Sequence, residues 1–145
     1  MKKLLLAILV ISSSAFGVSC TTKSSEKVPG KISGEIKVGA DLAAKLKNTD
    51  VLYIIARSQQ SGPPSAVKRI QHPSFPLKYV IGPEDAMVPG MAGGFGNGSN
   101  MTVTARISRT GNAMPSAGDL EGVFGGNPAH PGDNGVDIVI DRERN

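Results

Sequence analysis

Hydrophobic and polar residues alternate along several short segments of the chain, and turn-forming residues separate these segments. In residues 32–38, isoleucine, glycine and valine occupy every second position, which predicts a strand with one buried face. Residues 101–107 alternate in the same way, whereas residues 51–56 are apolar throughout, as in a central strand covered on both faces. The strands that we predict are 32–38, 51–56, 66–70, 77–81, 101–107 and 136–141.

Glycine and proline account for 18 and 10 of the 145 residues, and most of them lie between the predicted strands. Because both residues interrupt helices, this composition argues against a helical protein. Gly62-Pro63-Pro64 forces a turn, and residues 89–100 and 125–135 are expected to form two surface loops. Short strands separated by turns predict an all-β fold, an antiparallel β-sandwich of about seven strands with an Ig-like or cupredoxin-like architecture.

The N-terminal residues have the features of a targeting segment. Lys2 and Lys3 precede an apolar run over residues 4–11, and small polar residues follow this run. The run is much shorter than the about 20 residues that cross a bilayer as a helix. This order of basic, apolar and small residues is typical of a secretory signal peptide, which we place at residues 1–19.

Cys20 is the single cysteine of the chain, so no disulfide can form within it. It follows small residues at the expected cleavage site, as in the bacterial lipoprotein signal, where the cysteine becomes the lipidated first residue. We therefore expect Cys20 to anchor the chain to a lipid bilayer, with residues 20–30 as a flexible tether to a domain over residues 31–145. This places the domain in the bacterial cell envelope, facing the periplasm, and Thr21 favours the outer membrane. An ordinary signal peptide with an incidental cysteine is the alternative.

Charge and motifs narrow the function classes. Lysine and arginine number 16 against 12 acidic residues, but two of the lysines belong to the predicted signal peptide. Beyond the basic pair at residues 68–69 there is no basic cluster and no aromatic platform, so we expect no nucleic-acid binding. No hydrolase elbow or phosphate-binding loop is present. The acidic residues at 84–85, Asp119 and Glu121 lie in turns, where carboxylates satisfy backbone amides, so we expect a protein that is not an enzyme.

Copper is the metal for which the chain offers the most suitable ligand residues. His72, Met87 and Met91 supply the imidazole and thioether ligands that Cu(I) accepts, and the two methionines flank one loop. A blue-copper site also needs a cysteine thiolate, which lipidation of the single cysteine would remove. In the other interpretation the domain holds no cofactor, Met87, Met101 and Met114 fill gaps in the core, and His72 lies in an exposed loop.

Several blocks of the chain resemble one known family in their order and spacing. These blocks are residues 52–57, 62–64, 66–70, 75–77, 82–87, 105–115 and 118–122. They are similar to the C-terminal Ig-like periplasmic domain of the cytochrome c-type biogenesis protein H family. The resemblance implies a β-sandwich that assists the maturation of c-type cytochromes, with apocytochrome c or haem-ligation proteins as partners.

Two arginines interrupt or end apolar strands within these blocks. We expect Arg57 and Arg106 to extend along the sheet to solvent, or to pair with Asp119 or Glu121. The sequence and the resemblance together predict a non-enzymatic binding module that is anchored in the envelope. A periplasmic copper-handling protein that uses a Met/His site is the alternative.

Overall fold

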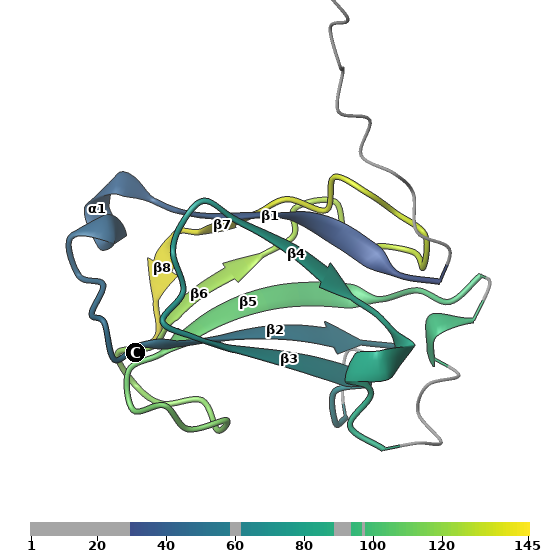
Figure 1. Ribbon diagram of the computed structural model, residues 1–145, viewed down its shortest axis with the longest axis horizontal. Helices are drawn as coiled ribbons and strands as arrows, with labels where there is room; N and C mark the ends of the chain where they lie inside the picture. The colour runs from purple at the N-terminus through teal and green to yellow at the C-terminus, as the bar shows by residue number, and fades with distance from the viewer. Residues whose placement is uncertain (1–29, 59–61, 89–93, 97) are drawn as a thin grey trace, which may run out of the picture.

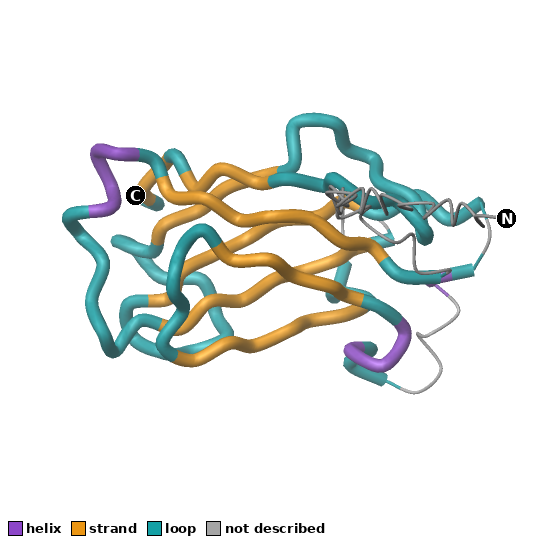
Figure 2. Tube along the Cα trace, turned by 45° about the horizontal axis from the view of Figure 1, so that its top comes forward, coloured by secondary structure: helices purple, strands orange, loops and turns teal. Residues whose placement is uncertain are grey.

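The computed structural model of the chain describes residues 30–58, 62–88, 94–96 and 98–145. The predicted signal peptide, Cys20 and Met91 lie outside these residues. Two β-sheets pack face to face with the hydrophobic core between them (Figure 1). The strands run along the length of the molecule, and loops and short helical segments lie at its ends (Figure 2). This arrangement confirms the predicted all-β sandwich.

The smaller sheet consists of β1 (Ile32–Val38), β4 (Leu77–Ile81) and β7 (Ile138–Ile140), in the order β4-β1-β7. The central strand β1 pairs antiparallel with β4 and parallel with β7. The parallel pair differs from the purely antiparallel sandwich that the alternation predicts. It arises because the last part of the chain returns to the free edge of β1 in the direction of β1 itself.

The larger sheet has five strands in the order β3-β2-β5-β6-β8, and all its pairs are antiparallel. Its strands are β3 (Ala66–Gln71), β2 (Val51–Arg57), β5 (Thr102–Ser108), β6 (Leu120–Val123) and β8 (Arg142–Glu143). The sequence pattern does not predict β6 or β8. Asp119 and Gly122 give the β6 segment the composition of a turn, and β8 is only two residues long.

Two of the helical segments in the described part of the chain are α1 (Ala40–Ala43) and the 3-10 helix η1 (Pro83–Asp85). No helix among these residues has the length and apolar character needed to cross a membrane. At η1, the carboxylate of Asp85 accepts hydrogen bonds from the Gly82 amide and from Lys68 Nζ, both at 3.1 Å. This acidic residue therefore does satisfy a turn amide, as the sequence predicts.

Strand β2 is buried on both faces, as its continuous apolar sequence predicts. Leu52 and Ile54 point into the core between the sheets, where Ile107 of the neighbouring strand joins them. Tyr53 and Ile55 lie on the opposite face of the larger sheet, which we call the outer face. Because alternate residues of a strand point to opposite faces, the register of β2 decides which side chains this outer face presents.

The two sheets come close together at Gly122. The chain leaves β7 in the smaller sheet and enters β8 in the larger one, and the Asp141 amide between them donates to the Glu121 carbonyl at 3.2 Å. A Cβ atom at Gly122 would lie 2.2 Å from the Val139 carbonyl oxygen. A residue without a side chain is therefore required at this position, because the two backbones are nearly in contact there.

Candidate binding surface

One row of side chains crosses the outer face of the larger sheet. The pairing register places Arg69 beside Tyr53, Tyr53 beside Arg106, Arg106 beside Glu121, and Glu121 beside Arg142. We call these five residues the outer row. Since neighbouring strands lie about 4.8 Å apart, the row spans about 19 Å and brings together residues from all five strands. Aromatic, basic and acidic groups thus alternate across a single face.

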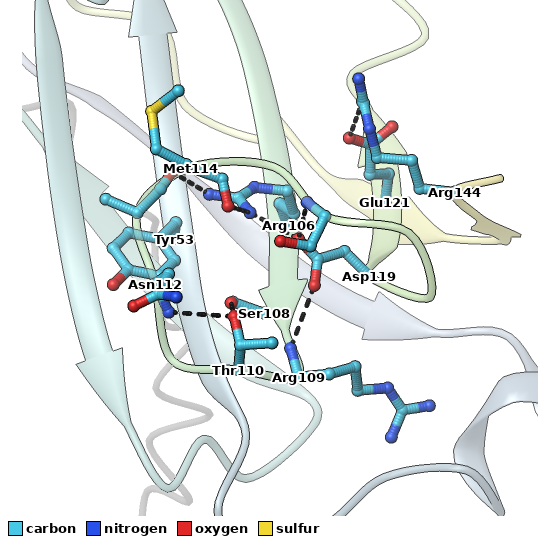
Figure 3. Close-up of polar contacts among 12 residues, drawn as sticks. Tyr53, Arg106, Ser108, Arg109, Thr110, Asn112, Met114, Asp119, Glu121 and Arg144 are labelled. Carbon is cyan, nitrogen blue, oxygen red and sulfur yellow. Dashed lines mark hydrogen bonds and ion pairs between the residues drawn. The ribbon is translucent and has the colours of Figure 1, made fainter.

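Arg106 is the buried centre of the outer row, with only 3% of its side chain exposed. Its Nη1 donates to Asp119 Oδ2 at 2.6 Å and to the Met114 carbonyl at 3.1 Å, and its Nη2 donates to the Ala113 carbonyl (Figure 3). Its guanidinium carbon also lies 5.2 Å from the centre of the Tyr53 ring, within the range of a cation–π contact. Of the alternatives that the sequence left open for Arg106, the structure shows the pairing with Asp119.

Asp119 organises the turn before β6. It is fully buried and accepts hydrogen bonds from the Ser116 amide at 3.0 Å and the Arg109 amide at 3.1 Å, in addition to Arg106. Burial raises the pKa of this carboxyl, but the two amide bonds and the Arg106 guanidinium outweigh burial and hold the pKa below its ordinary value. Asp119 therefore stays ionised, which suits a structural anion and not a proton carrier.

The loop over residues 109–118 is fastened to the outer face at several points. Besides its bonds to Arg106, it is held by Tyr53, whose hydroxyl donates to the Gly111 carbonyl at 2.8 Å. Arg69 Nε in turn donates to the Tyr53 hydroxyl at 3.2 Å. Gly111 has a φ of 77°, a conformation that favours glycine in such a tight turn. The loop is thus held in place by the buried part of the outer row.

A hollow of about 300 Å³ opens beside this loop. Its lining residues that carry charge are Arg57, Arg106, Arg142, Arg144 and Glu121, and we call it the arginine hollow. Its other walls include Ile55, Thr104, Val123 and Pro115. The hollow therefore lies on strands β2, β5, β6 and β8 of one sheet face, with the fixed loop as its rim.

The arginine hollow carries more positive than negative charge. Glu121 Oε1 accepts a hydrogen bond from Arg144 Nη1 at 2.8 Å, and Glu121 Oε2 lies 3.9 Å from Arg142 Nε. The Arg57 side chain has no hydrogen-bond or ion-pair partner within the described part of the chain. From the sequence we expect Arg57 either to extend to solvent or to pair with a carboxylate. Its side chain lines the hollow and has no carboxylate partner in the described residues. One carboxylate therefore faces three arginines that are not buried in internal pairs.

The candidate copper ligands do not meet in the described residues. His72 follows the last residue of β3, and its Nδ1 donates to the Asn48 carbonyl. The Met87 amide donates to the carbonyl of Ser65, which precedes the first residue of β3, at 3.2 Å. His72 and Met87 are thus at opposite ends of β3, about 20 Å apart at the rise of a strand. Met91 lies outside the described residues, which hold no group of three or more His, Cys, Asp or Glu side chains suited to a metal ion.

The methionines divide between the core and the surface. Met101 is fully buried in the core, as the interpretation without copper predicts. The same interpretation is wrong for Met87 and Met114, whose exposed fractions are 59% and 75%. Each lies on a segment whose backbone is held by hydrogen bonds from elsewhere, so the side chain is not needed to fill the core.

Sequence reasoning missed Arg142 and Arg144 as members of this surface. They are two residues apart, and this spacing places side chains on the same face of an extended strand. This spacing can be read from the end of the sequence. The sequence does not show that β8 pairs with β6, and it is this pairing that brings the arginines next to Glu121.

The fold and this surface define a class: a small Ig-like β-sandwich whose outer sheet face bears a fixed loop and a basic hollow. Residues 32–141 match the family described as the cytochrome c-type biogenesis protein H Ig-like domain. The chain belongs to this family, as the resemblance of its sequence blocks predicts. Its membership connects it with the biogenesis of c-type cytochromes.

A relative from Aquifex aeolicus (strain VF5) is similar along nearly the whole length of both chains. It is 30% identical over 145 aligned positions, which cover 96% of this chain and 92% of the relative, and it is described as an uncharacterized protein. No solved structure matches the chain. The family assignment thus rests on the sequence, and the two-sheet architecture agrees with it.

Proposed function

We propose that this chain is a non-enzymatic, envelope-anchored binding module that acts in c-type cytochrome biogenesis. In this role it holds a partner protein, apocytochrome c or a component of haem ligation, against the outer face of the larger sheet. Family membership supports the process, and the arginine hollow beside a fixed loop supports the surface. The hollow is the observation that carries the proposal. Three of its arginines are not buried in internal ion pairs, so they are available to a partner.

The polar groups of the surface favour binding over catalysis. Asp119 is occupied by Arg106 and two backbone amides, and its pKa is lowered, so it has no free proton to give near neutral pH. Glu121 is engaged by Arg144. A surface in which the acids are bound and the arginines are in excess is suited to the recognition of an anionic partner. The proposed role needs no cofactor and no nucleic acid.

The proposal includes attachment through a lipidated Cys20 and a periplasm-facing domain, with the outer membrane as the favoured site. Strand β1 begins at Ile32, so a tether over residues 20–30 would join the sandwich close to the start of that strand. This end of the chain carries none of the residues of the arginine hollow. Anchoring and partner binding would therefore use separate parts of the chain.

Co-purification tests the proposal. The full chain is extracted from membranes in mild detergent, captured, and probed for apocytochrome c and haem-ligation proteins. We expect these proteins to be enriched with the wild type and with the Lys78→Gln control, which removes an exposed positive charge from β4 in the other sheet. The double variant Arg57→Gln/Arg142→Gln should lose them. Equal recovery with all three proteins, or recovery with none, would overturn the proposed function.

A further inference from the structure

We propose that the arginine hollow is a carboxylate-binding site that takes an acidic, extended segment of a partner polypeptide. The inference rests on the proposed function for the partner being a protein, and it adds the chemistry by which that protein is recognised. Guanidinium groups present paired N–H donors whose geometry matches a carboxylate, and this makes arginine more selective for such a ligand than lysine. Every basic side chain that lines the hollow is an arginine.

The positions of the arginines favour a polypeptide over a small molecule. Along the sheet, Arg57 pairs with Thr102, which is four residues from Arg106 on β5. Across the sheet, Arg142 lies in the same row as Arg106, on a strand that is three strands away from β2. Their backbones are thus about 14 Å apart across the sheet and about 13 Å apart along it. An extended segment of about six residues covers that diagonal. A volume of about 300 Å³ is also at the lower end for sites that enclose small ligands.

The hollow has donors that await an acceptor. The Arg57 side chain lines the hollow and has no hydrogen-bond or ion-pair partner in the described residues. A carboxylate bound in the hollow would accept hydrogen bonds from Arg57, whereas the Arg106 Nε, which also has no partner in the described residues, is buried out of the ligand's reach.

The rim of the hollow offers apolar contacts to the same segment. Val123 lines the hollow with 40% of its surface exposed, and Pro115 lines it from the loop next to the exposed Met114. These exposed apolar side chains can bury apolar side chains that lie between the carboxylates of an extended chain. The expected ligand is therefore an extended segment in which every second residue faces the hollow and these facing residues include both acidic and apolar side chains.

Glu121 is the internal competitor for this ligand. It is bound to Arg144 at 2.8 Å and lies near Arg142, so an incoming carboxylate must share these two arginines with it. Substitution of Glu121 by Gln removes the competitor and keeps the shape of the side chain. We expect the Glu121→Gln variant to bind an acidic segment more tightly than the wild type does.

Fluorescence anisotropy with a synthetic peptide tests the site. The probe is a peptide of about ten residues that repeats glutamate, serine, valine and serine, so that glutamate and valine share one face of the extended chain. Its partner probe has glutamine in place of glutamate. The full chain in detergent should bind the glutamate peptide and not the glutamine peptide. Arg57→Gln and Arg142→Gln should each weaken binding about tenfold. Lys78→Gln should leave it unchanged, and thermal melts establish that all variants are folded.

Equal binding of the two peptides, or equal binding by wild type and both arginine variants, would overturn the inference. A porphyrin bearing two carboxylates is measured in parallel. If it binds in an Arg57-dependent manner while the glutamate peptide does not, the ligand is a small molecule and the inference fails. The measurement contains no cytochrome, so its failure is distinct from a failure to recover apocytochrome c in the co-purification.

Discussion

Arg106 Nη1 and Asp119 Oδ2 lie 2.6 Å apart, and only 3% of the arginine side chain and none of the aspartate side chain is exposed. The pair joins the outer face of β5 to the turn before β6. Through the carbonyls of Ala113 and Met114, the same guanidinium fixes the loop that forms the rim of the arginine hollow. One buried ion pair thus connects the fold of the larger sheet to its candidate binding surface.

Removal of one partner from this pair should be strongly destabilising. Asp119→Ala leaves a buried guanidinium without its counter-ion and two amides without their acceptor, at an expected cost of about 3–5 kcal/mol in the free energy of unfolding. Glu121→Gln affects a more exposed pair and should cost about 1 kcal/mol or less. Urea titration of the two variants measures both costs. Similar small losses for the two would mean that the buried pair is not important for stability.

The lowered pKa of Asp119 predicts how stability depends on pH. Because the unfolded chain binds a proton at this carboxyl more readily than the folded one, the stabilisation by Asp119 is complete above the unfolded pKa of about 3.9. It is lost as the pH falls through the lower pKa of the folded state. The difference in the free energy of unfolding between wild type and Asp119→Asn should therefore shrink below about pH 4. A constant difference between pH 6 and pH 2 would contradict this origin.

Gly122 is expected to tolerate no side chain. A Cβ atom there would lie 2.2 Å from the Val139 carbonyl oxygen and 2.9 Å from the Ile140 Cα, so Gly122→Ala must push the two sheets apart. We expect a loss of about 1–3 kcal/mol, as for overpacked cores. Gly125→Ala is the matched control, since no atom lies within 4 Å of its Cβ position. Equal thermal stability of the two variants would show that β6 and β7 are not held this closely.

Lipidation of Cys20 predicts how the chain fractionates. The wild type should sediment with membranes and incorporate radiolabelled fatty acid, because the acyl chains of a lipidated cysteine bind the bilayer almost irreversibly. Cys20→Ser should incorporate no label and leave the membrane fraction. Separation of inner and outer membranes then tests the expected outer-membrane site. A wild-type chain that takes up no label would show that the cysteine is incidental.

Much of the sandwich could be predicted because its strands alternate. In β5, Val103 and Ala105 face the core while Thr104 and Arg106 face outward, as the period of two requires. The continuous apolar run of β2 likewise marks a central strand with two covered faces. In both strands the local pattern and the final environment agree, so a short window of sequence is sufficient.

The remainder depends on contacts between distant parts of the chain. Gly122 resembles a turn residue in the sequence, yet it lies within β6 because the β7 backbone passes against it. The arginine hollow was missed for a similar reason. Arg57 and Arg142 come from strands far apart in sequence, and only the strand order brings them to one face. The Arg106–Asp119 pair could be predicted because its members lie close in sequence, with Arg106 on β5 and Asp119 in the turn before the adjacent strand β6.

The most direct test of the account measures c-type cytochromes in the cells that carry the gene. A deletion strain receives the wild-type chain, the Arg57→Gln/Arg142→Gln variant or the Lys78→Gln control, each at equal abundance. Covalently bound haem is then measured in gels of membrane and periplasmic protein. The account predicts that deletion lowers c-type cytochromes and that the wild type and Lys78→Gln restore them while the double variant does not. Unchanged cytochromes after deletion, or full restoration by the double variant, would contradict it.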